Sequence, residues 1–222
     1  MVAGRLLTKA GRDGITTRAV AEAAGVQPPV LYRLFKDKDS LLDALAEHAF
    51  VRYLAKKQLR PSGKGAIDSL RAGWDLHVEF GLLNPALYLL MYAEPRKGGR
   101  SPAAEHSFQL LRAHIRDVAA EGRLRISEKS AAHLYHASAL GTVLSLLNMA
   151  VEARDMSLSN TAREAALAAI LTDLPTSKRP DLANAAITLR ALLDDKAPLS
   201  PGERRLLVEW LDRLAEHRTE QS

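Results

Sequence analysis

The sequence contains no cysteine, which excludes disulfide bonds and zinc sites built on cysteine. A chain without cysteine suits a reducing cytoplasm, so the cytoplasm is the expected location. The sequence also lacks any apolar run near the roughly 18 residues that a membrane-spanning helix needs, and no charged segment followed by an apolar one opens the chain. We therefore expect no membrane among its partners.

Aromatic residues are few: two Trp, five Tyr and four Phe among 222 residues. Strand-like alternation of apolar and polar residues is missing, whereas apolar residues recur at the 3.6-residue period of a helix. The fold is therefore expected to be all-α. Proline and glycine clusters separate helices expected at residues 3–12, 17–24, 28–35, 39–58, 66–82, 84–93, 102–121, 128–153, 160–173, 181–194 and 201–217.

Positive charge is concentrated near the start of the chain. The net charge of +5 comes from 31 Lys and Arg against 26 Asp and Glu. Residues 1–60 hold 11 of the basic and 6 of the acidic residues, so the remaining residues are balanced. A segment that binds phosphate groups needs such an excess, although a solvated basic face has the same composition.

The stretch 16–38 predicts two short helices joined by a turn. Thr17 can cap the first helix, because its hydroxyl can accept a hydrogen bond from a free backbone N–H. Gly25 follows where a sharp turn favours a residue that tolerates positive φ. Pro28 and Pro29 then open a second helix in its first turn, where a missing N–H costs least. This pattern is typical of a helix-turn-helix whose second helix enters a DNA major groove.

This stretch resembles the DNA-binding domain of the TetR/AcrR family of bacterial transcriptional regulators, over roughly residues 4–57. The resemblance is carried by Thr16-Thr17, Val20-Ala21, Ala24-Gly25-Val26, Leu31-Tyr32, Phe35 and Lys38. A weaker resemblance, in the motif Phe-x-x-x-Asn-Pro-x-Leu-Tyr within residues 74–92, is to the ligand-binding half of one subgroup. Together they imply a helix-turn-helix DNA-binding domain over 1–57 and a larger helical ligand-binding and dimerisation domain over 58–222.

Two features differ from the family pattern. The family's first helix is longer than the residues before Gly14 allow, so either the natural start lies upstream or this helix is trimmed. Pro28 and Pro29 stand where relatives more often have a polar or basic residue and a glycine. Because the prolines remove two backbone donors and stiffen the helix entry, we expect a different preferred DNA sequence.

The second helix of this motif has an inner and an outer face. Leu31 and Phe35 are four residues apart, so they share a face and are expected to pack on Val20 and Ala24. Arg33 then points outward, where its planar guanidinium can bond O6 and N7 of guanine together. Arg33 is therefore the expected base-reading residue.

Other outward residues complete the expected interface. Gln27 either bonds adenine or caps the helix, and Val30 can touch a thymine methyl group. The family resemblance implies that the Tyr32 hydroxyl reaches a phosphate, and the remaining residues are placed to hold the DNA backbone. The expected contacts with double-stranded operator DNA are Thr17, Arg18, Gln27, Pro29, Val30, Tyr32, Arg33 and Lys38.

A second group of residues is a candidate effector site. Four of the aromatic residues lie between 74 and 92, in a cluster that is either packed core or the apolar wall of a pocket. The family resemblance favours a pocket for a small, mostly apolar effector. The expected ligand-binding residues are Trp74, His77, Phe80, Tyr88, Met91 and Tyr92. His133 and His136 are three apart without a carboxylate at ligand spacing, so no metal site and no cofactor is expected.

The second half of the chain carries apolar surfaces. Residues 137–147 are apolar nearly all round and must be buried in the core or against a partner. With residues 162–174 they match the region where the family builds a four-helix dimer interface, so we expect a homodimer on a palindromic operator. Leu206, Leu207, Trp210, Leu211 and Leu214 form an apolar stripe that docks either on its own subunit or on the partner.

These features favour a ligand-responsive DNA-binding transcriptional regulator, a repressor, over two alternatives. One alternative is a small all-α enzyme using the histidines, but the chain has no Ser-His-Asp order, glycine-rich phosphate loop or paired carboxylates, so no enzyme is expected. The other is a helical protein-binding adaptor, which the concentrated basic charge and the helix-turn-helix pattern disfavour.

Overall fold

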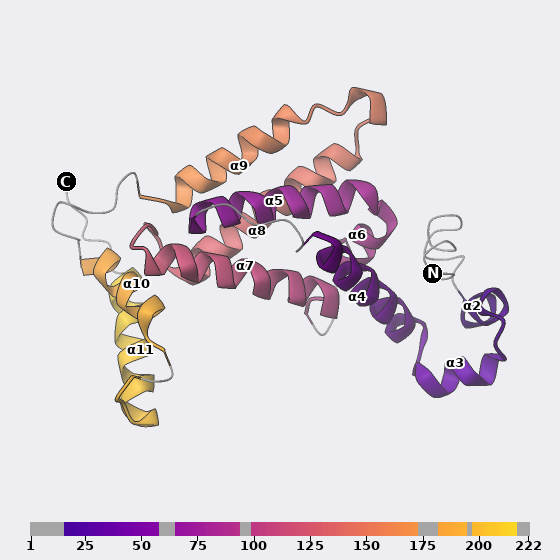
Figure 1. Cartoon of the computed structure of the whole chain (residues 1–222), viewed down its shortest axis with the longest axis horizontal. Coiled ribbons are helices and arrows are strands. Elements are labelled where there is room, and N and C mark those ends of the chain that lie inside the picture. The colour runs from indigo at the N-terminus through magenta and orange to yellow at the C-terminus, as the bar shows by residue number, and fades with distance from the viewer. Residues whose placement is uncertain (1–15, 58–64, 94–98, 173–181, 195–196, 217–222) are drawn as a thin grey trace. The chain divides into compact units, whose positions relative to one another are not determined.

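The computed structural model describes residues 16–57, 65–93, 99–172, 182–194 and 197–216 (Figure 1). Within these ranges the regular elements are helices, with one isolated antiparallel bridge between Leu124 and Leu171, so the all-α prediction is confirmed. The helices are α2 (Thr17–Ala24), α3 (Pro28–Leu34), α4 (Lys38–Lys57), α5 (Ala66–Leu83), α6 (Pro85–Tyr92), α7 (Pro102–Ala120), α8 (Glu128–Leu147), the short 3-10 helix η1 (Val151–Ala153), α9 (Ser157–Ile170), α10 (Leu182–Leu192) and α11 (Pro201–Glu216). None of these described helices is both long and apolar enough to cross a membrane.

Prolines begin several of these helices, which is why the sequence located them well. Pro28, Pro85, Pro102 and Pro201 are each the first residue of a helix, a position where their fixed φ is favourable. The predicted helix at 3–12 lies outside the described residues.

One predicted helix was wrong at its end. The sequence suggested a helix from 128 to 153, but α8 ends at Leu147 and Ala150 is extended, with a ψ of 144°. Arg154 Nε donates to the carbonyl oxygen of Leu146 at 3.0 Å, which satisfies a carbonyl that the next helical turn would otherwise have bonded. Continuous apolar periodicity hid this end, because no glycine or proline marks it.

The chain divides into two compact units. The first comprises Met1–Pro61 and His77–Ser107, and the second Ser62–Leu76 and Phe108–Ser222. This division differs from the domain boundary expected after residue 57, because it groups His77–Ser107 with the N-terminal segment. The expected boundary between DNA-binding and regulatory functions stays a prediction.

The first unit is built around α4. The apolar stripe expected on this helix is buried, and it consists of Leu41, Leu42, Leu45, Phe50 and Leu54. Phe50 meets Phe80 of α5 edge-on, with ring centroids 5.4 Å apart. Helix α6 packs against α4 and buries Tyr88, Leu90 and Met91. The helix that follows the helix-turn-helix is thus packed directly on the segment that carries the candidate effector residues.

The second unit is held together by a buried Trp–Tyr pair. The indole N–H of Trp74 donates to Ser159 Oγ at 3.0 Å, and the Trp74 ring meets Tyr135 edge-on at 5.1 Å. The Tyr135 hydroxyl donates to the carbonyl oxygen of Leu70 at 2.9 Å, and burial raises the pKa of this phenol. These bonds satisfy the polar atoms that α5, α8 and α9 bury together.

The last two helices pack on each other. Helix α11 contacts α10, Leu211 is buried, and Arg190 Nε lies 3.4 Å from Asp212 Oδ1. The apolar stripe predicted on α11 therefore docks partly on its own chain. Leu206 and Trp210 of that stripe stay exposed.

Candidate functional site

Helix α2 begins one residue earlier than the predicted cap. The N-cap is Thr16, whose Oγ1 accepts a hydrogen bond from the backbone N–H of Ala19 at 3.0 Å. Thr17, which the sequence analysis assigned as the cap, is instead the first helical residue. Two adjacent threonines are equivalent as local capping signals, so the choice between them was wrong. Because Thr17 does not cap, its hydroxyl is available for another contact.

That contact is with Tyr32 of the next helix. Thr17 Oγ1 donates to Tyr32 Oη at 2.9 Å, which ties the start of α2 to the middle of α3. The Tyr32 side chain is 62% exposed. Since the threonine supplies the donor, the phenol O–H is left free to donate to a group outside the protein. The structure thus brings together two of the residues expected to hold a DNA backbone.

The turn between α2 and α3 has the predicted geometry. Gly25 has a φ of 68° and a ψ of 26°, the left-handed conformation that a glycine adopts without strain. Its N–H donates to the Glu22 carbonyl at 3.1 Å, and the N–H of Val26 donates to Ala21 at 3.0 Å. These two bonds close the end of α2 and direct the chain into α3.

The inner face of the motif differs from the prediction in detail. Val20 and Leu31 are buried as expected, but Ala24 is exposed and Phe35 is only half-buried, just after the end of α3. Ala21, which is fully buried, takes the place expected for Ala24.

The outer face carries several exposed side chains that have no partner among the described residues. Arg18, Gln27 and Arg33 are exposed and form no hydrogen bond or ion pair with any described residue. Pro29 is exposed and Val30 half-buried. Gln27 is the N-cap residue of α3 but makes no side-chain capping bond, so the capping alternative is wrong.

Lys38 is the first residue of α4 and half-buried. Next to it, Asp37 Oδ1 accepts from the N–H of Ser40 at 2.8 Å, and Ser40 Oγ accepts from the N–H of Asp37 at 3.1 Å. The hydrogen bond from the Ser40 backbone N–H, followed by that from the Ser40 side chain, lowers the pKa of the Asp37 carboxyl. The sequence analysis missed this capping pair, although the spacing Asp-x-x-Ser before an apolar run predicts it. Lys38 and the positive end of the helix dipole therefore lie together, a combination that favours an anionic partner.

Three of the expected effector residues form one polar aromatic cluster in the first unit. His77 Nε2 and Tyr88 Oη are 2.8 Å apart and share a hydrogen bond. The His77 ring lies 5.3 Å from Tyr88 and 5.6 Å from Tyr92, and the two tyrosine rings are 4.7 Å apart. Burial raises the pKa of Tyr88 and raises that of Tyr92 to about 12. Both phenols therefore stay neutral donors at physiological pH.

The other expected effector residues are placed differently. Phe80 and Met91 are buried in the first unit, where Phe80 also packs on Tyr53 with ring centroids 5.2 Å apart. Trp74 lies one turn before His77 on α5, but its partners Ser159 and Tyr135 belong to the second unit. The structure thus brings five of the six residues into one unit and Trp74 into the other.

A contact that the sequence did not reveal joins α4 and α7. His106 Nδ1 lies 3.0 Å from Glu47 Oε1, and the His106 ring meets Phe50 edge-on at 5.7 Å. His133 and His136 lie elsewhere, with their rings 5.2 and 5.3 Å from that of Phe108. The described part of the chain holds no group of three or more His, Asp or Glu side chains that suits a metal ion.

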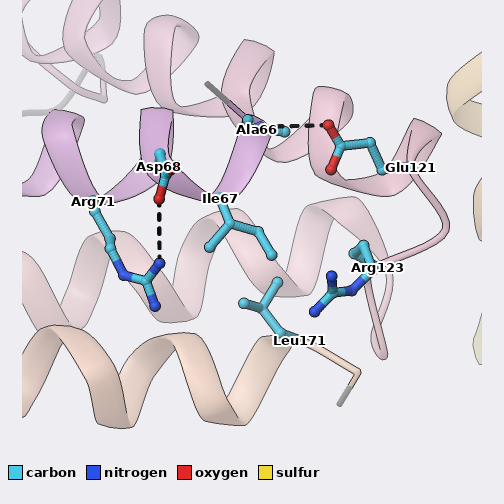
Figure 2. Close-up of a pocket in the computed structure, with 8 residues that line it drawn as sticks. Ala66, Ile67, Asp68, Arg71, Glu121, Arg123 and Leu171 are labelled. Carbon is cyan, nitrogen blue, oxygen red and sulfur yellow. Dashed lines mark hydrogen bonds and ion pairs between the residues drawn. The ribbon is translucent and has the colours of Figure 1, made fainter. Parts of the chain in front are cut away.

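A cavity of about 420 Å³ opens in the second unit (Figure 2). Most of its polar groups already have partners within the protein. Arg71 pairs with Asp68 at 3.4 Å and with Glu164 outside the cavity at 3.0 Å, Glu121 Oε1 accepts from the N–H of Ala66, and Arg123 donates to a backbone carbonyl. The lining residues are Gly65, Ala66, Ile67, Asp68, Arg71, Glu121, Arg123 and Leu171.

Comparison with known proteins bears on the helix-turn-helix. Residues 2–45 match the family described as bacterial regulatory proteins, tetR family. Over 42 residues the chain is 60% identical to the tetracycline repressor protein class A from transposon 1721 of Escherichia coli, covering 19% of each chain. Residues 2–45 thus belong to the DNA-binding segment of the tetR family. Over 119 residues it is 32% identical to the class G tetracycline repressor of Vibrio anguillarum, covering 53% of this chain and 52% of that one.

Two solved structures have a fold similar to that of this chain beyond residues 2–45. One is a putative tetR family transcription regulator from Shewanella sp. PV-4, with a TM-score of 0.60, 18% identity and coverage of 77% of this chain and 95% of that one. Another is a TetR from Streptomyces coelicolor, with a TM-score of 0.54, 17% identity and coverage of 98% and 86%. The chain spans only about a fifth of the length of the tetracycline repressors that it matches at 60% identity.

Proposed function

We propose that this TetR-family protein is a cytoplasmic transcriptional repressor that binds a palindromic operator as a homodimer and is released by a small, mostly apolar ligand. The observation that carries the proposal is the exposed face of α2 and α3. On this face the Tyr32 phenol is held by a hydrogen bond from Thr17, and Arg18 and Arg33 have no partner among the described residues. The face belongs to the segment that holds the whole excess of positive charge.

The residues of this face divide into two roles. Arg33 reads a guanine in the major groove, with Gln27, Pro29 and Val30 beside it on the entry of α3. Thr17 and Tyr32 hold one phosphate through the free phenol proton, and Arg18 and Lys38 hold phosphates by charge. Phosphate contacts fix the position of the protein but do not read sequence, so Arg33 carries most of the discrimination.

The proposed homodimer uses the outer faces of α8 and α9, which pack together within one chain. On α8 the exposed residues at helical spacing are Leu134, Ala137, Gly141 and Ser145, and on α9 Ala165, Ala168 and Ala169 are exposed. Small side chains allow a second pair of helices to approach closely. A two-fold dimer also suits the operator, since two recognition helices related by that axis match a palindrome.

The proposed effector site lies in the first unit, at His77, Phe80, Tyr88, Met91 and Tyr92. The buried rings supply apolar walls, and the His77–Tyr88 pair supplies a polar group that can exchange its internal bond for one to a ligand. Phe50 of α4 touches Phe80, so a ligand that displaces Phe80 moves the helix that follows the helix-turn-helix. A ligand that fits better in one position of α4 shifts the equilibrium towards it.

The test is a DNA-binding titration of the purified chain. A duplex recovered from a random library and a shuffled duplex of equal length are titrated at several salt concentrations, with the wild type and with Arg33→Ala. Arg116→Ala serves as the matched control, because Arg116 is likewise an exposed arginine and lies on α7. We expect selective binding of the recovered duplex that only Arg33→Ala weakens. Failure to recover any preferred duplex, or an equal loss in the control, contradicts the proposal and favours an enzyme or an adaptor.

A further inference from the structure

Helix α10 has an outer face without a polar residue. Its exposed residues are Leu182, Ala185, Leu189 and Leu192, with the three leucines 58%, 49% and 59% exposed. Leucines at this exposure normally alternate with charged residues on a helix surface. A whole helical face made of them marks a surface that another element covers.

The orientation of this face is set by the buried side of α10. Asn184 is buried and its Nδ2 donates to the carbonyl oxygen of Leu124 at 3.0 Å, while Ala186 and Ile187 are also buried. These contacts anchor the helix to the turn between α7 and α8. Helix α11 packs on α10 but leaves the four outward residues exposed. Rotation of α10 to hide them would therefore break the Asn184 bond.

The spacing of the four residues is symmetric. They are separated by three, four and three positions, so the pattern reads the same in both directions about a point level with residue 187. Two copies of α10 that pack antiparallel across a two-fold axis place Leu182 opposite Leu192 of the partner subunit. The same packing places Ala185 opposite Leu189 of the partner subunit, a small side chain against a large one. The three-four spacing also matches the seam by which paired helices interlock.

We infer that α10 packs antiparallel on α10 of a second copy of this chain. The face carries no charge, so two copies bring no like charges together and bury no unpaired ion. Four side chains cover much less than the roughly 800 Å² per partner of a stable interface. The α10 pair therefore adds to another contact between copies, and in this respect the inference rests on the homodimer proposed above.

The absence of cysteine makes a direct test possible. Two single variants, Ala185→Cys and Leu189→Cys, are co-expressed with different tags and treated with a short bis-maleimide. We expect a covalent heterodimer of the two variants, formed faster than the covalent homodimer of either variant alone, because only the mixed pair places the two thiols opposite each other. Arg116→Cys measures cross-linking by random collision. A mixed pair that cross-links no faster than this control overturns the inference. A monofunctional maleimide measures whether each thiol is accessible, and accessible thiols that still do not cross-link faster than the control also overturn it.

A second measurement keeps the inference separate from the proposed homodimer. Leu189→Lys should raise the dissociation constant between copies by about tenfold or more, since each copy loses a buried leucine. Leu206→Lys is the matched control, because Leu206 is 46% exposed on α11 and outside the symmetric face. The helix content of both variants is checked by circular dichroism, and their dissociation constants are then compared by sedimentation. If Leu189→Lys unfolds, Leu189→Ala is used in its place.

The outcomes are distinct. A wild-type dimer that Leu189→Lys weakens selectively supports the inference, as does a larger assembly that the same variant reduces to a dimer. A wild-type dimer unaffected by Leu189→Lys overturns the α10 pair and leaves the proposed homodimer intact. A wild-type chain that is monomeric at micromolar concentration and does not cross-link overturns both.

Discussion

Removing the Tyr32 hydroxyl tests the most specific feature of the proposed DNA interface. Tyr32→Phe keeps the ring but deletes the oxygen that accepts the 2.9 Å bond from Thr17. In the free protein this bond is exposed, so water replaces it and we expect a loss of folding stability of about 0.5 kcal/mol. In the complex the phenol O–H donates to a charged phosphate, a bond worth about 1.5–3 kcal/mol. The variant should therefore bind DNA about 10- to 150-fold more weakly per site while staying folded.

The form of the loss distinguishes a phosphate contact from a base contact. A phosphate contact carries no sequence information, so Tyr32→Phe should weaken preferred and shuffled duplexes by the same factor. The phenol is neutral and releases no counterion, so the slope of log affinity against log salt should not change. Lys38→Ala should instead reduce that slope by about one per site.

Fluorescence anisotropy with labelled duplexes at four or five salt concentrations measures both quantities. Thr17→Val is the companion variant, because it leaves the phenol in place but removes the bond that orients it. Its loss should be smaller, and the double variant should lose little more than Tyr32→Phe alone. An affinity unchanged by Tyr32→Phe, or a loss confined to the preferred duplex, would refute the assignment of this hydroxyl to a phosphate.

The other predictions concern the base contact, the effector and a helix cap. Arg33→Ala should cost about 1–3 kcal/mol per site on the preferred duplex and less on the shuffled one, and an equal loss in the two titrations would reassign it to phosphate. Tyr88→Phe should weaken a ligand recovered in a thermal-shift screen, whereas Tyr135→Phe should not, as calorimetry would show. Equal affinities of Tyr88→Phe and Tyr135→Phe for the ligand would show that it does not bind at the His77–Tyr88 pair. Asp37→Ala should lower the melting temperature at pH 7. The pKa of Asp37 in the folded protein lies below its ordinary value of 3.8. The higher melting temperature of the wild type relative to Asp37→Ala should therefore be present above pH 3.8 and decrease as the pH falls below 3.8. Thermal melts of both proteins between pH 2.5 and 7 test this.

Features that depend on a few neighbouring residues were predictable from the sequence. Gly25 in the left-handed region, the proline starts of α3, α6, α7 and α11, and the buried stripe of α4 all follow from local rules. Where two local signals were equivalent, as for Thr16 and Thr17, the same rules could not choose. Where no breaker marked a helix end, as at Leu147, they failed.

The sequence by itself determined that the chain is helical, that its basic charge lies on a helix-turn-helix, and that Pro29, Tyr32 and Arg33 of that motif are exposed, although it placed Ala24 on the inner face. These properties depend on helix period, capping and turn chemistry within a few residues. The tertiary structure alone decided which distant groups satisfy one another. Thr17 is hydrogen-bonded to Tyr32 across 15 residues, His77 to Tyr88 across 11 residues, and Trp74 to Ser159 across 85 residues. A buried donor must find an acceptor wherever the packed helices bring one. The period of α10 likewise shows an apolar face, but only the Asn184 anchor establishes that this face points away from its own subunit.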